Sequence, residues 1–346
     1  MRPRWRLAAG VMVTMVLVVA ACGDDDDDDA GGTPAGTGDP AASTTTTEAE
    51  TEFEDVVLAD GRLTIPGQNI GDVDLTALPV GDDHVVTDAP AAGDLFLCDT
   101  FPSDGGGTDV QGPWFNGDGT FDLTAKLFVL GEVPWDEARF ETAVEGDTRS
   151  LVGNNLPVDH TTGEFPIAEG DPAREFDANP SEIVANEYDL SVPANPTENA
   201  EPQCVGGEAG FLLSGVILNS PVDARRRDAV AWEAQDHCHG HPNQAGYHYH
   251  SISPCVSDEG TGHSELVGYA FDGFGIFGHR GEGGEVLTNE DLDECHGHTH
   301  EIEWDGETVE MYHYHATWEF PYAVGCFRGT NQQQGPPFAN AGPPPA

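Results

Sequence analysis

The sequence predicts a mostly β protein with minor helix, built from antiparallel hairpins and stapled by disulfides. The central chain is rich in glycine and proline, and its short apolar runs, such as 120–130 and 211–218, are bounded by turn residues, which is typical of strands. A histidine-rich string occurs twice and fits a hairpin each time. Seven cysteines stand in a chain that begins like an exported protein. Helices are expected only around Asp136–Ala143 and Asp223–Ala234.

The N-terminus predicts a lipoprotein-type signal peptide over residues 1–22. Three arginines within the first six residues precede an apolar run at 7–21, and Val-Ala-Ala directly before Cys22 resembles a bacterial lipobox. We expect Cys22 to be lipidated, which makes the lipid bilayer a partner and places the protein outside the cytoplasm, anchored to a bacterial cell membrane. A plain secretory peptide or an uncleaved anchor is the alternative. The apolar run is too short for a spanning helix.

Composition divides the rest of the chain. Residues 23–54, acidic and threonine-rich, cannot bury apolar surface and are predicted to form a disordered tether. Residues 330–346, rich in proline and glutamine, are predicted to be a disordered tail. Between them we expect a β-rich N-terminal region or subdomain at 55–145 and a second domain at 146–329, which carries both histidine-rich repeats.

The chain is strongly acidic. It holds 62 aspartates and glutamates against 13 lysines and arginines, a formal net charge of −49. Binding to nucleic acid requires a positive footprint, so the composition excludes nucleic acid as a partner. The plain interpretation of this charge is a solvated acidic surface.

Histidines concentrate in the repeated string. All of the 14 histidines except His84 and His160 lie between His237 and His315. Each copy of the string reads Cys-His-Gly-His, followed later by Tyr-His-Tyr-His. Imidazole is the commonest protein metal ligand, and histidine-rich sites outside the cytosol suit a zinc or copper ion best. The predicted metal ligands are His239, His241, His248, His250, His296, His298, His313 and His315.

The second copy predicts a hairpin with a defined register. Asp-Gly at 305–306, flanked by alternating polar and apolar residues, is a strong signal for a two-residue turn. Counting outward from this turn places His298 opposite His313 and His296 opposite His315. Strand side chains alternate between faces, so we expect these four imidazoles on one face, close enough to share an ion.

The first copy independently predicts the same arrangement, with His241 opposite His248 and His239 opposite His250. On the other face of each hairpin, a glycine leaves room for the tyrosine ring opposite it. These glycine–tyrosine pairs are Gly240 with Tyr249 and Gly297 with Tyr314.

Other histidines are weaker candidates. His237 and His300 extend the same faces in one copy each and are secondary candidates. His263 and His279 are expected in loops, and His84 is expected to be an incidental surface residue. The alternative to a metal site is a structural stack in which imidazoles and tyrosines pack and share hydrogen bonds.

Six cysteines remain besides Cys22, and an even number favours disulfides in an exported chain. One cysteine follows each Tyr-His-Tyr-His string, and the repeat symmetry then suggests the connectivity. The predicted disulfides are Cys238–Cys255, Cys295–Cys326 and Cys98–Cys204. The rival interpretation is metal ligation by the thiolates of Cys238 and Cys295.

Several separated strings match a known family in order. They are the two Tyr-His-Tyr-His strings, the glycine- and phenylalanine-rich segment 266–278, the segment 321–329, and the upstream strings at 155–160 and 163–166. Together they resemble the YHYH-domain family of exported proteins, over about residues 145–329. The resemblance implies an exported domain centred on the histidine strings and implies no particular reaction. It also makes His160 a secondary candidate.

The favoured hypothesis is an exported, membrane-tethered domain that binds a metal ion for capture or delivery. The rival is a secreted metalloenzyme, a hydrolase or an oxidase, with an open coordination position and an acid or base such as His160, Asp272 or Glu294. A third hypothesis is a structural cell-surface domain without metal. The sequence contains no nucleophile elbow, zincin or P-loop motif to favour a common enzyme class.

Overall fold

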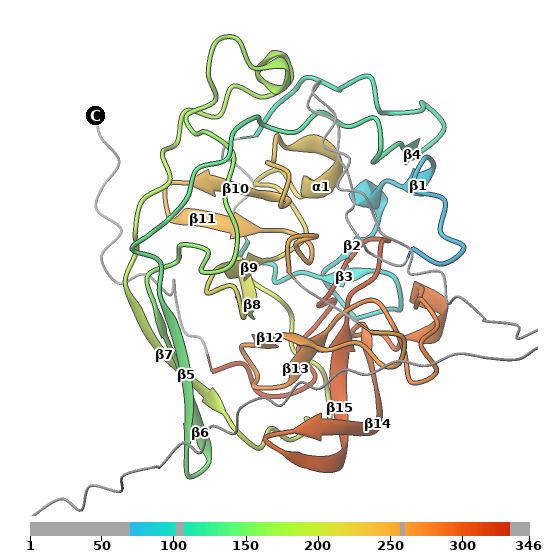
Figure 1. Cartoon of the computed structure of the whole chain (residues 1–346). Coiled ribbons are helices and arrows are strands. Elements are labelled where there is room, and N and C mark those ends of the chain that lie inside the picture. Colours follow the sequence, from blue (N-terminus) through green and yellow to red (C-terminus); the bar gives the residue numbers. More distant parts are fainter. Residues whose placement is uncertain (1–69, 102–106, 257–259, 333–346) are drawn as a thin grey trace, which may run out of the picture. The chain divides into compact units, whose positions relative to one another are not determined.

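The computed structural model describes residues 70–101, 107–256 and 260–332, all within one compact unit, Glu52–Ala346 (Figure 1). The predicted signal peptide (1–22), the tether (23–54) and most of the predicted tail lie outside the described residues. Over the ranges that are described, no helix has both the length and the apolar character needed to cross a bilayer.

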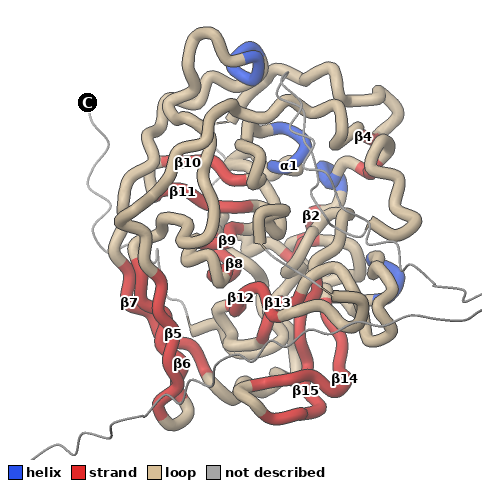
Figure 2. Tube along the Cα trace, viewed as in Figure 1, coloured by secondary structure: helices blue, strands red, loops and turns tan. Residues whose placement is uncertain are grey.

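Strands dominate the regular structure, and helices are few and short, which confirms the predicted class (Figure 2). The helical elements are α1 (Ala229–Trp232) and the 3-10 turns η1 (Gly81–Asp83), η2 (Pro172–Glu175) and η3 (Asn289–Asp291). The strands are β1 (Leu78–Pro79), β2 (Val85–Val86), β3 (Leu95–Phe96), β4 (Thr120–Phe121), β5 (Phe140–Glu145), β6 (Thr148–Gly153), β7 (Tyr188–Pro193), β8 (Glu208–Leu212), β9 (Ile217–Asn219), β10 (Gly240–Asn243), β11 (Gly246–Tyr249), β12 (Leu266–Ala270), β13 (Gly275–Phe277), β14 (Gly297–Trp304) and β15 (Glu307–His315).

An eight-stranded sheet in the order β10-β11-β9-β8-β12-β13-β15-β14 carries both repeats (Figure 1). Each half contains a hairpin, β8–β9 or β12–β13, followed by a histidine-rich hairpin, β10–β11 or β14–β15. In each half the second strands of the two hairpins run parallel. The halves meet at the central antiparallel pair β8–β12. The internal duplication read from the sequence is therefore a duplication of half a sheet, with one histidine-rich hairpin at each edge.

The predicted hairpin register is confirmed. In β14–β15, Trp304 opposes Glu307 and His298 opposes His313. In β10–β11, His241 opposes His248. Both ladders end on the glycine of the Cys-His-Gly-His string, so the histidine before that glycine lies outside the strand in each copy.

The glycine–tyrosine pairs are also confirmed, but another ring fills the space beside each glycine. Gly240 opposes Tyr249 as predicted, yet a Cβ atom at Gly240 would lie 2.1 Å from the hydroxyl oxygen of Tyr247. At Gly297 the corresponding clash, at 2.4 Å, is with the hydroxyl oxygen of Tyr312. The first tyrosine of each Tyr-His-Tyr-His string therefore makes the close approach that requires glycine.

All three predicted disulfides are present. The pairs are Cys98–Cys204, Cys238–Cys255 and Cys295–Cys326. They close loops with sequence separations of 106, 17 and 31 residues, and the two shorter loops each tie the start of a histidine-rich hairpin to the segment after it.

Two helix predictions need correction. The segment Asp136–Ala143 is no helix: its last residues, from Phe140, enter β5, where pairing with β6 satisfies their backbone hydrogen bonds. Of Asp223–Ala234, only Ala229–Trp232 is helical. Arg226 adopts a positive φ of 65°, which stops the helix upstream, and the Asp228 carboxylate then caps it by accepting the amides of Val230 and Ala231.

A second sheet, β5-β6-β7, contacts the turn of the second histidine-rich hairpin. Its β5–β6 hairpin crosses the predicted boundary between residues 145 and 146. Buried Arg149 of β6 donates from Nη2 to both carboxylate oxygens of Asp305, at 2.9 and 2.8 Å, in the hairpin turn. Its guanidinium also lies 4.3 Å from the ring centre of Tyr269 and 4.9 Å from that of Trp304. Charge pairing and cation–π contact thus fix the turn of β14–β15 against the other sheet.

Candidate metal centres

A buried aspartate shapes the start of the first histidine-rich hairpin. Asp236 Oδ1 accepts the amides of Cys238 and Gly240 at 3.0 and 3.1 Å, and its Oδ2 accepts the Tyr247 hydroxyl at 2.8 Å. This tight turn forces His239, between the two amides, into a left-handed conformation with φ of 59°. The strand begins only at the next residue.

The second copy repeats this arrangement. Asp293 Oδ1 accepts the amides of Cys295 and Gly297 at 2.9 and 3.1 Å, and it also accepts the Tyr312 hydroxyl at 2.9 Å. His296 has a φ of 74°. The same local chemistry therefore produces the same backbone turn in both copies.

These turns remove one histidine from each predicted block of four. His239 stacks on Phe128, with ring centres 5.3 Å apart and planes 7° from parallel. His296 Nε2 lies 2.9 Å from the hydroxyl oxygen of Thr317. The expectation that these two histidines share a face with the others is wrong, because the alternation of strand side chains does not apply at positive φ.

The remaining histidines of the first copy converge in what we call the first cluster: His241, His248, His250 and Glu233. All three imidazoles are 5% exposed or less. The Nε2 atom of His250 lies 3.1 Å from that of His248 and 3.1 Å from that of His241. The three histidines thus offer three nitrogens to one point in space.

Backbone carbonyls fix the tautomers of two of these rings. His248 Nδ1 lies 3.0 Å from the carbonyl oxygen of Gly246, and His250 Nδ1 lies 2.6 Å from that of Ser220. A carbonyl only accepts, so each Nδ1 carries the hydrogen and each neutral ring has a bare lone pair on Nε2. Burial lowers the pKa of His248 to about 3 and that of His250 to about 4, so protonation does not relieve the contact at neutral pH.

Glu233 adds a carboxylate to the first cluster. It follows α1 directly, and its Oε2 lies 3.3 Å from His241 Nε2 and 3.4 Å from His250 Nε2, without hydrogen-bond geometry to any described residue. Burial, followed by repulsion from Asp223 and Asp177, raises the pKa of Glu233 to about 8. The cluster borders a cavity of about 670 Å³, which Glu233 and all three histidines help to line.

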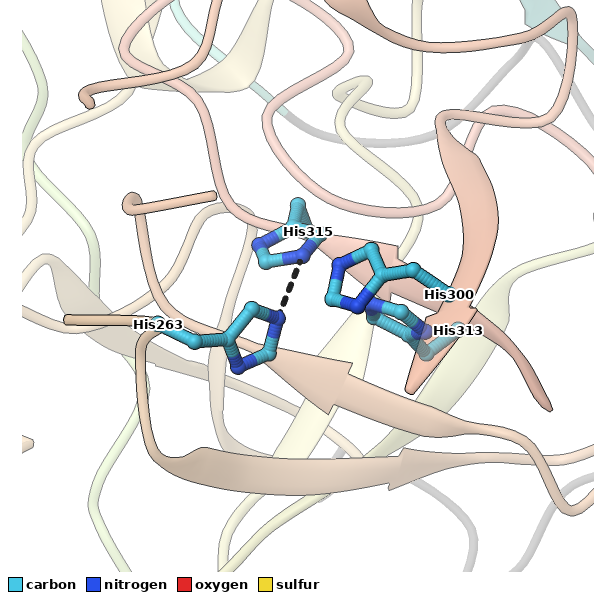
Figure 3. Close-up of side chains that lie close together, drawn as sticks. All are labelled: His263, His300, His313 and His315. Atoms are coloured by element: carbon cyan, nitrogen blue, oxygen red, sulfur yellow. Dashed lines mark hydrogen bonds between the residues drawn. The ribbon is translucent and has the colours of Figure 1, made fainter. Parts of the chain in front are cut away.

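The histidines of the second copy form the second cluster: His263, His298, His300, His313 and His315. Figure 3 shows four of them, with His263 entering from a loop opposite the hairpin. His263 Nε2 lies 3.2 Å from His315 Nε2. His298 packs its ring centre 4.6, 4.9 and 4.8 Å from those of His300, His313 and His315.

Carbonyl oxygens again orient the rings. The Nδ1 atoms of His300, His313 and His315 lie 2.9, 2.9 and 2.8 Å from the carbonyl oxygens of Glu301, Met311 and Gly278, in that order. The Nε2 atoms of His298, His300 and His313 are buried and have no hydrogen-bond partner among the described residues. Burial lowers the pKa of His313 to about 3 and that of His298 to about 4, which keeps both rings neutral.

Both clusters fit a transition-metal ion. Ligand nitrogens at about 2.0–2.1 Å from a tetrahedral zinc ion lie roughly 3.3 Å from one another, close to the observed separations of 3.1 and 3.2 Å. Bare imidazole nitrogens directed at one another repel unless a cation lies between them, and the carbonyl contacts supply the outer hydrogen bonds that metal-bound histidines normally make.

Of the secondary candidates, only His300 lies in one of the two clusters. His160 bridges the Tyr249 hydroxyl, at 2.8 Å, and the Asp159 carboxylate, at 2.6 Å. Buried Asp272 accepts the Tyr314 hydroxyl at 2.6 Å, and Glu294 pairs with Arg328 at 3.2 Å.

Cysteine thiolates are not ligands in this structure. A ring nitrogen of His237 lies within 4.8 Å of the sulfur atoms of Cys238 and Cys255, but these two sulfurs form a disulfide. Cys295 is likewise bonded to Cys326. The rival interpretation, ligation by the thiolates of Cys238 and Cys295, is therefore wrong.

Sequence reasoning missed Glu233 and His263. Glu233 lies near the end of a predicted helical segment, three residues before Asp236, and this proximity to the repeat was the only available signal. His263 lies in a glycine-rich loop between the repeats, and no spacing rule connects it to the second hairpin. Only the tertiary fold brings either residue to its cluster.

Residues 189–285 match the model of a known family, described as YHYH protein. This match includes the whole first cluster and ends before the second histidine-rich hairpin. No curated protein and no solved structure matches the chain. Over residues 189–285 the chain is thus similar to the YHYH family, in agreement with the resemblance of its histidine motifs.

Proposed function

We propose that this protein is an exported, membrane-tethered metal-binding domain that captures or delivers a zinc or copper ion through its two clusters. The observation that carries the proposal is the contact between His248 and His250. Their Nε2 atoms lie 3.1 Å apart, and both Nδ1 atoms face carbonyl oxygens. Two neutral rings held in this way have no proton to share, and a metal ion between them turns the repulsion into coordination.

The rest of the chain fits a role at the cell surface. The lipobox at Cys22 would tether the domain to a bacterial membrane, and the net charge of −49 would draw cations toward it. Paired cysteines suit an oxidising compartment, where histidine replaces thiolate as the practical ligand for zinc or copper.

Metal analysis tests this proposal. We expect the purified chain, loaded with zinc or copper and then dialysed, to retain about two ions, one for each cluster. The double variant His248→Gln, His250→Gln should lose one of them. His84→Gln is the matched control, because His84 is exposed and pairs only with Asp94. A protein that retains no stoichiometric metal and gains no thermal stability from added zinc or copper would contradict the proposal.

A further inference from the structure

The two clusters differ in what they offer to an ion. The second cluster supplies four imidazoles whose ligand nitrogens lie within 4.8 Å of one another, with His298 packed beside them, enough to fill a tetrahedral shell of zinc or copper with protein nitrogens. The first cluster supplies three imidazoles, with one carboxylate beside them. A shell of three protein nitrogens leaves a position for an exogenous ligand, which is the arrangement that distinguishes reactive metal sites from structural ones.

The surroundings of the first cluster provide room for such a ligand. His241, His248, His250 and Glu233 line one wall of the cavity of about 670 Å³, a volume within the usual range for small-molecule sites. Each histidine is only 3–5% exposed, yet all three are among the residues that line this cavity. A small molecule in the cavity would therefore lie against the imidazoles of the first cluster.

The charge of the cavity restricts the class of ligand. Asp177, Glu208 and Asp223 line it together with Glu233, so an anion would meet several carboxylates. Asn179, Asn219 and Asn243 add amides that can donate to or accept from a polar organic molecule. An uncharged oxygen donor suits this lining better than phosphate or another anion.

Glu233 is placed to act on that ligand. Its Oε2 lies 3.3 and 3.4 Å from two of the three ligand nitrogens and has no hydrogen-bond partner among the described residues. A buried oxygen without a hydrogen-bond partner beside a coordination position is suited to hydrogen-bond to a metal-bound ligand.

We infer that the first cluster, when it holds an ion, is an exchangeable site that takes an uncharged oxygen-donor ligand from the cavity, with Glu233 as a hydrogen-bond partner of that ligand, whereas the second cluster is coordinatively filled. This inference rests on the proposed metal-binding function and adds a ligand class to one of its two sites. It also names the cluster at which any metal-assisted reaction of this protein would occur.

Cobalt(II) provides the test, because its visible absorption responds to its ligands. The probe is acetohydroxamic acid, a small uncharged oxygen donor that can release one proton on binding. One variant keeps the first cluster (His300→Gln, His313→Gln), and another keeps the second (His241→Gln, His248→Gln). We expect a saturable spectral change with the first variant and none with the second. Glu233→Ala should retain cobalt but bind the probe at least tenfold more weakly.

The outcomes separate the two proposals. Failure of the wild-type chain to bind cobalt in stoichiometric amount would contradict the metal-binding function itself. Cobalt binding without a response to the probe, or an equal response from both clusters, would overturn the exchangeable site. An unchanged probe affinity in Glu233→Ala would overturn the role of Glu233. If a double variant does not fold, the wild-type chain decides: about half of its bound cobalt should respond.

Discussion

His239 and His241 are separated by a single glycine, yet only His241 joins the first cluster. His239 instead stacks against Phe128, because its positive φ turns the side chain away from the strand face. The corresponding histidine of the second copy, His296, behaves in the same way. Neighbours in one motif therefore have different roles, and this difference is measurable.

The first prediction concerns that difference. His239→Gln should leave the metal content unchanged, because its ring does not contact the other imidazoles of the cluster. His241→Gln should weaken metal binding at the first cluster by at least tenfold, because it removes one of three nitrogens. Competition with a chromophoric chelator measures both affinities. Equal losses in the two variants would show that His239 is a ligand after all.

The second prediction tests whether Cys238 and Cys255 stabilise the fold as a disulfide or bind the metal as thiolates. Replacing both Cys238 and Cys255 by alanine opens the loop of 17-residue separation and should lower the free energy of unfolding by about 3 kcal/mol. Metal stoichiometry should remain that of the wild type, because neither sulfur is available as a thiolate. Denaturant unfolding and elemental analysis provide the two measurements. Loss of one ion per folded chain would instead favour a thiolate ligand.

The third prediction concerns Lys126, the only lysine, which is buried and donates to the Val230 carbonyl and to Gln235 Oε1. Burial lowers its pKa from 10.5 to about 7. The unfolded chain then binds more protons than the folded chain between these values, so this lysine makes stability rise with pH from about 7 to 10.5. At full extent the effect amounts to a few kcal/mol, on the order of 1.4 for each pH unit.

Lys126→Met isolates that contribution. The difference in unfolding free energy between wild type and variant should change between pH 8 and 9.5, with the wild type gaining stability relative to the variant as the pH rises. Denaturant unfolding at several pH values measures this slope, which does not depend on the hydrogen bonds that the variant also loses. A difference that stays flat over this range would mean that the buried amine remains charged.

The fourth prediction compares the two repeats. Tyr247→Phe removes a donor from Asp236, which is fully buried, and should cost about 1.5–3 kcal/mol of stability. Tyr312→Phe removes the equivalent donor from Asp293, which is only partly buried, and should cost about 1 kcal/mol. Denaturant midpoints of the two variants measure this ranking. A reversed order would mean that burial of the aspartate does not set the cost.

The hairpin registers could be predicted because they depend on local signals. The Asp305-Gly306 turn and the two-residue alternation of strands together determine which residues oppose one another, and no distant contact competes with them. The disulfide pairs followed from the same repeat. The alternation of strand side chains did not predict the position of His239, however. That position depends on Asp236, three residues upstream, because its carboxylate accepts the amides that follow and holds them in a turn.

At Asp136–Ala143, by contrast, a contact with another strand determined the structure, and the local prediction of a helix was wrong. Its last residues, from Phe140, form a strand because β6 lies beside them, and nothing within the segment indicates that partner. Glu233 and His263 reached their clusters through contacts of the same long-range kind. Local patterns thus predicted the scaffold and most imidazoles, whereas the residues that make the clusters unlike each other depended on the assembled fold.

The symmetry of the eight-stranded sheet has a consequence for how this domain arose. His250 is oriented by Ser220, at the end of β9, and His315 is oriented by Gly278, at the end of β13, so each half-sheet contains its own hairpin and its own orienting strand. Such self-sufficient halves are what duplication of an ancestral gene segment produces.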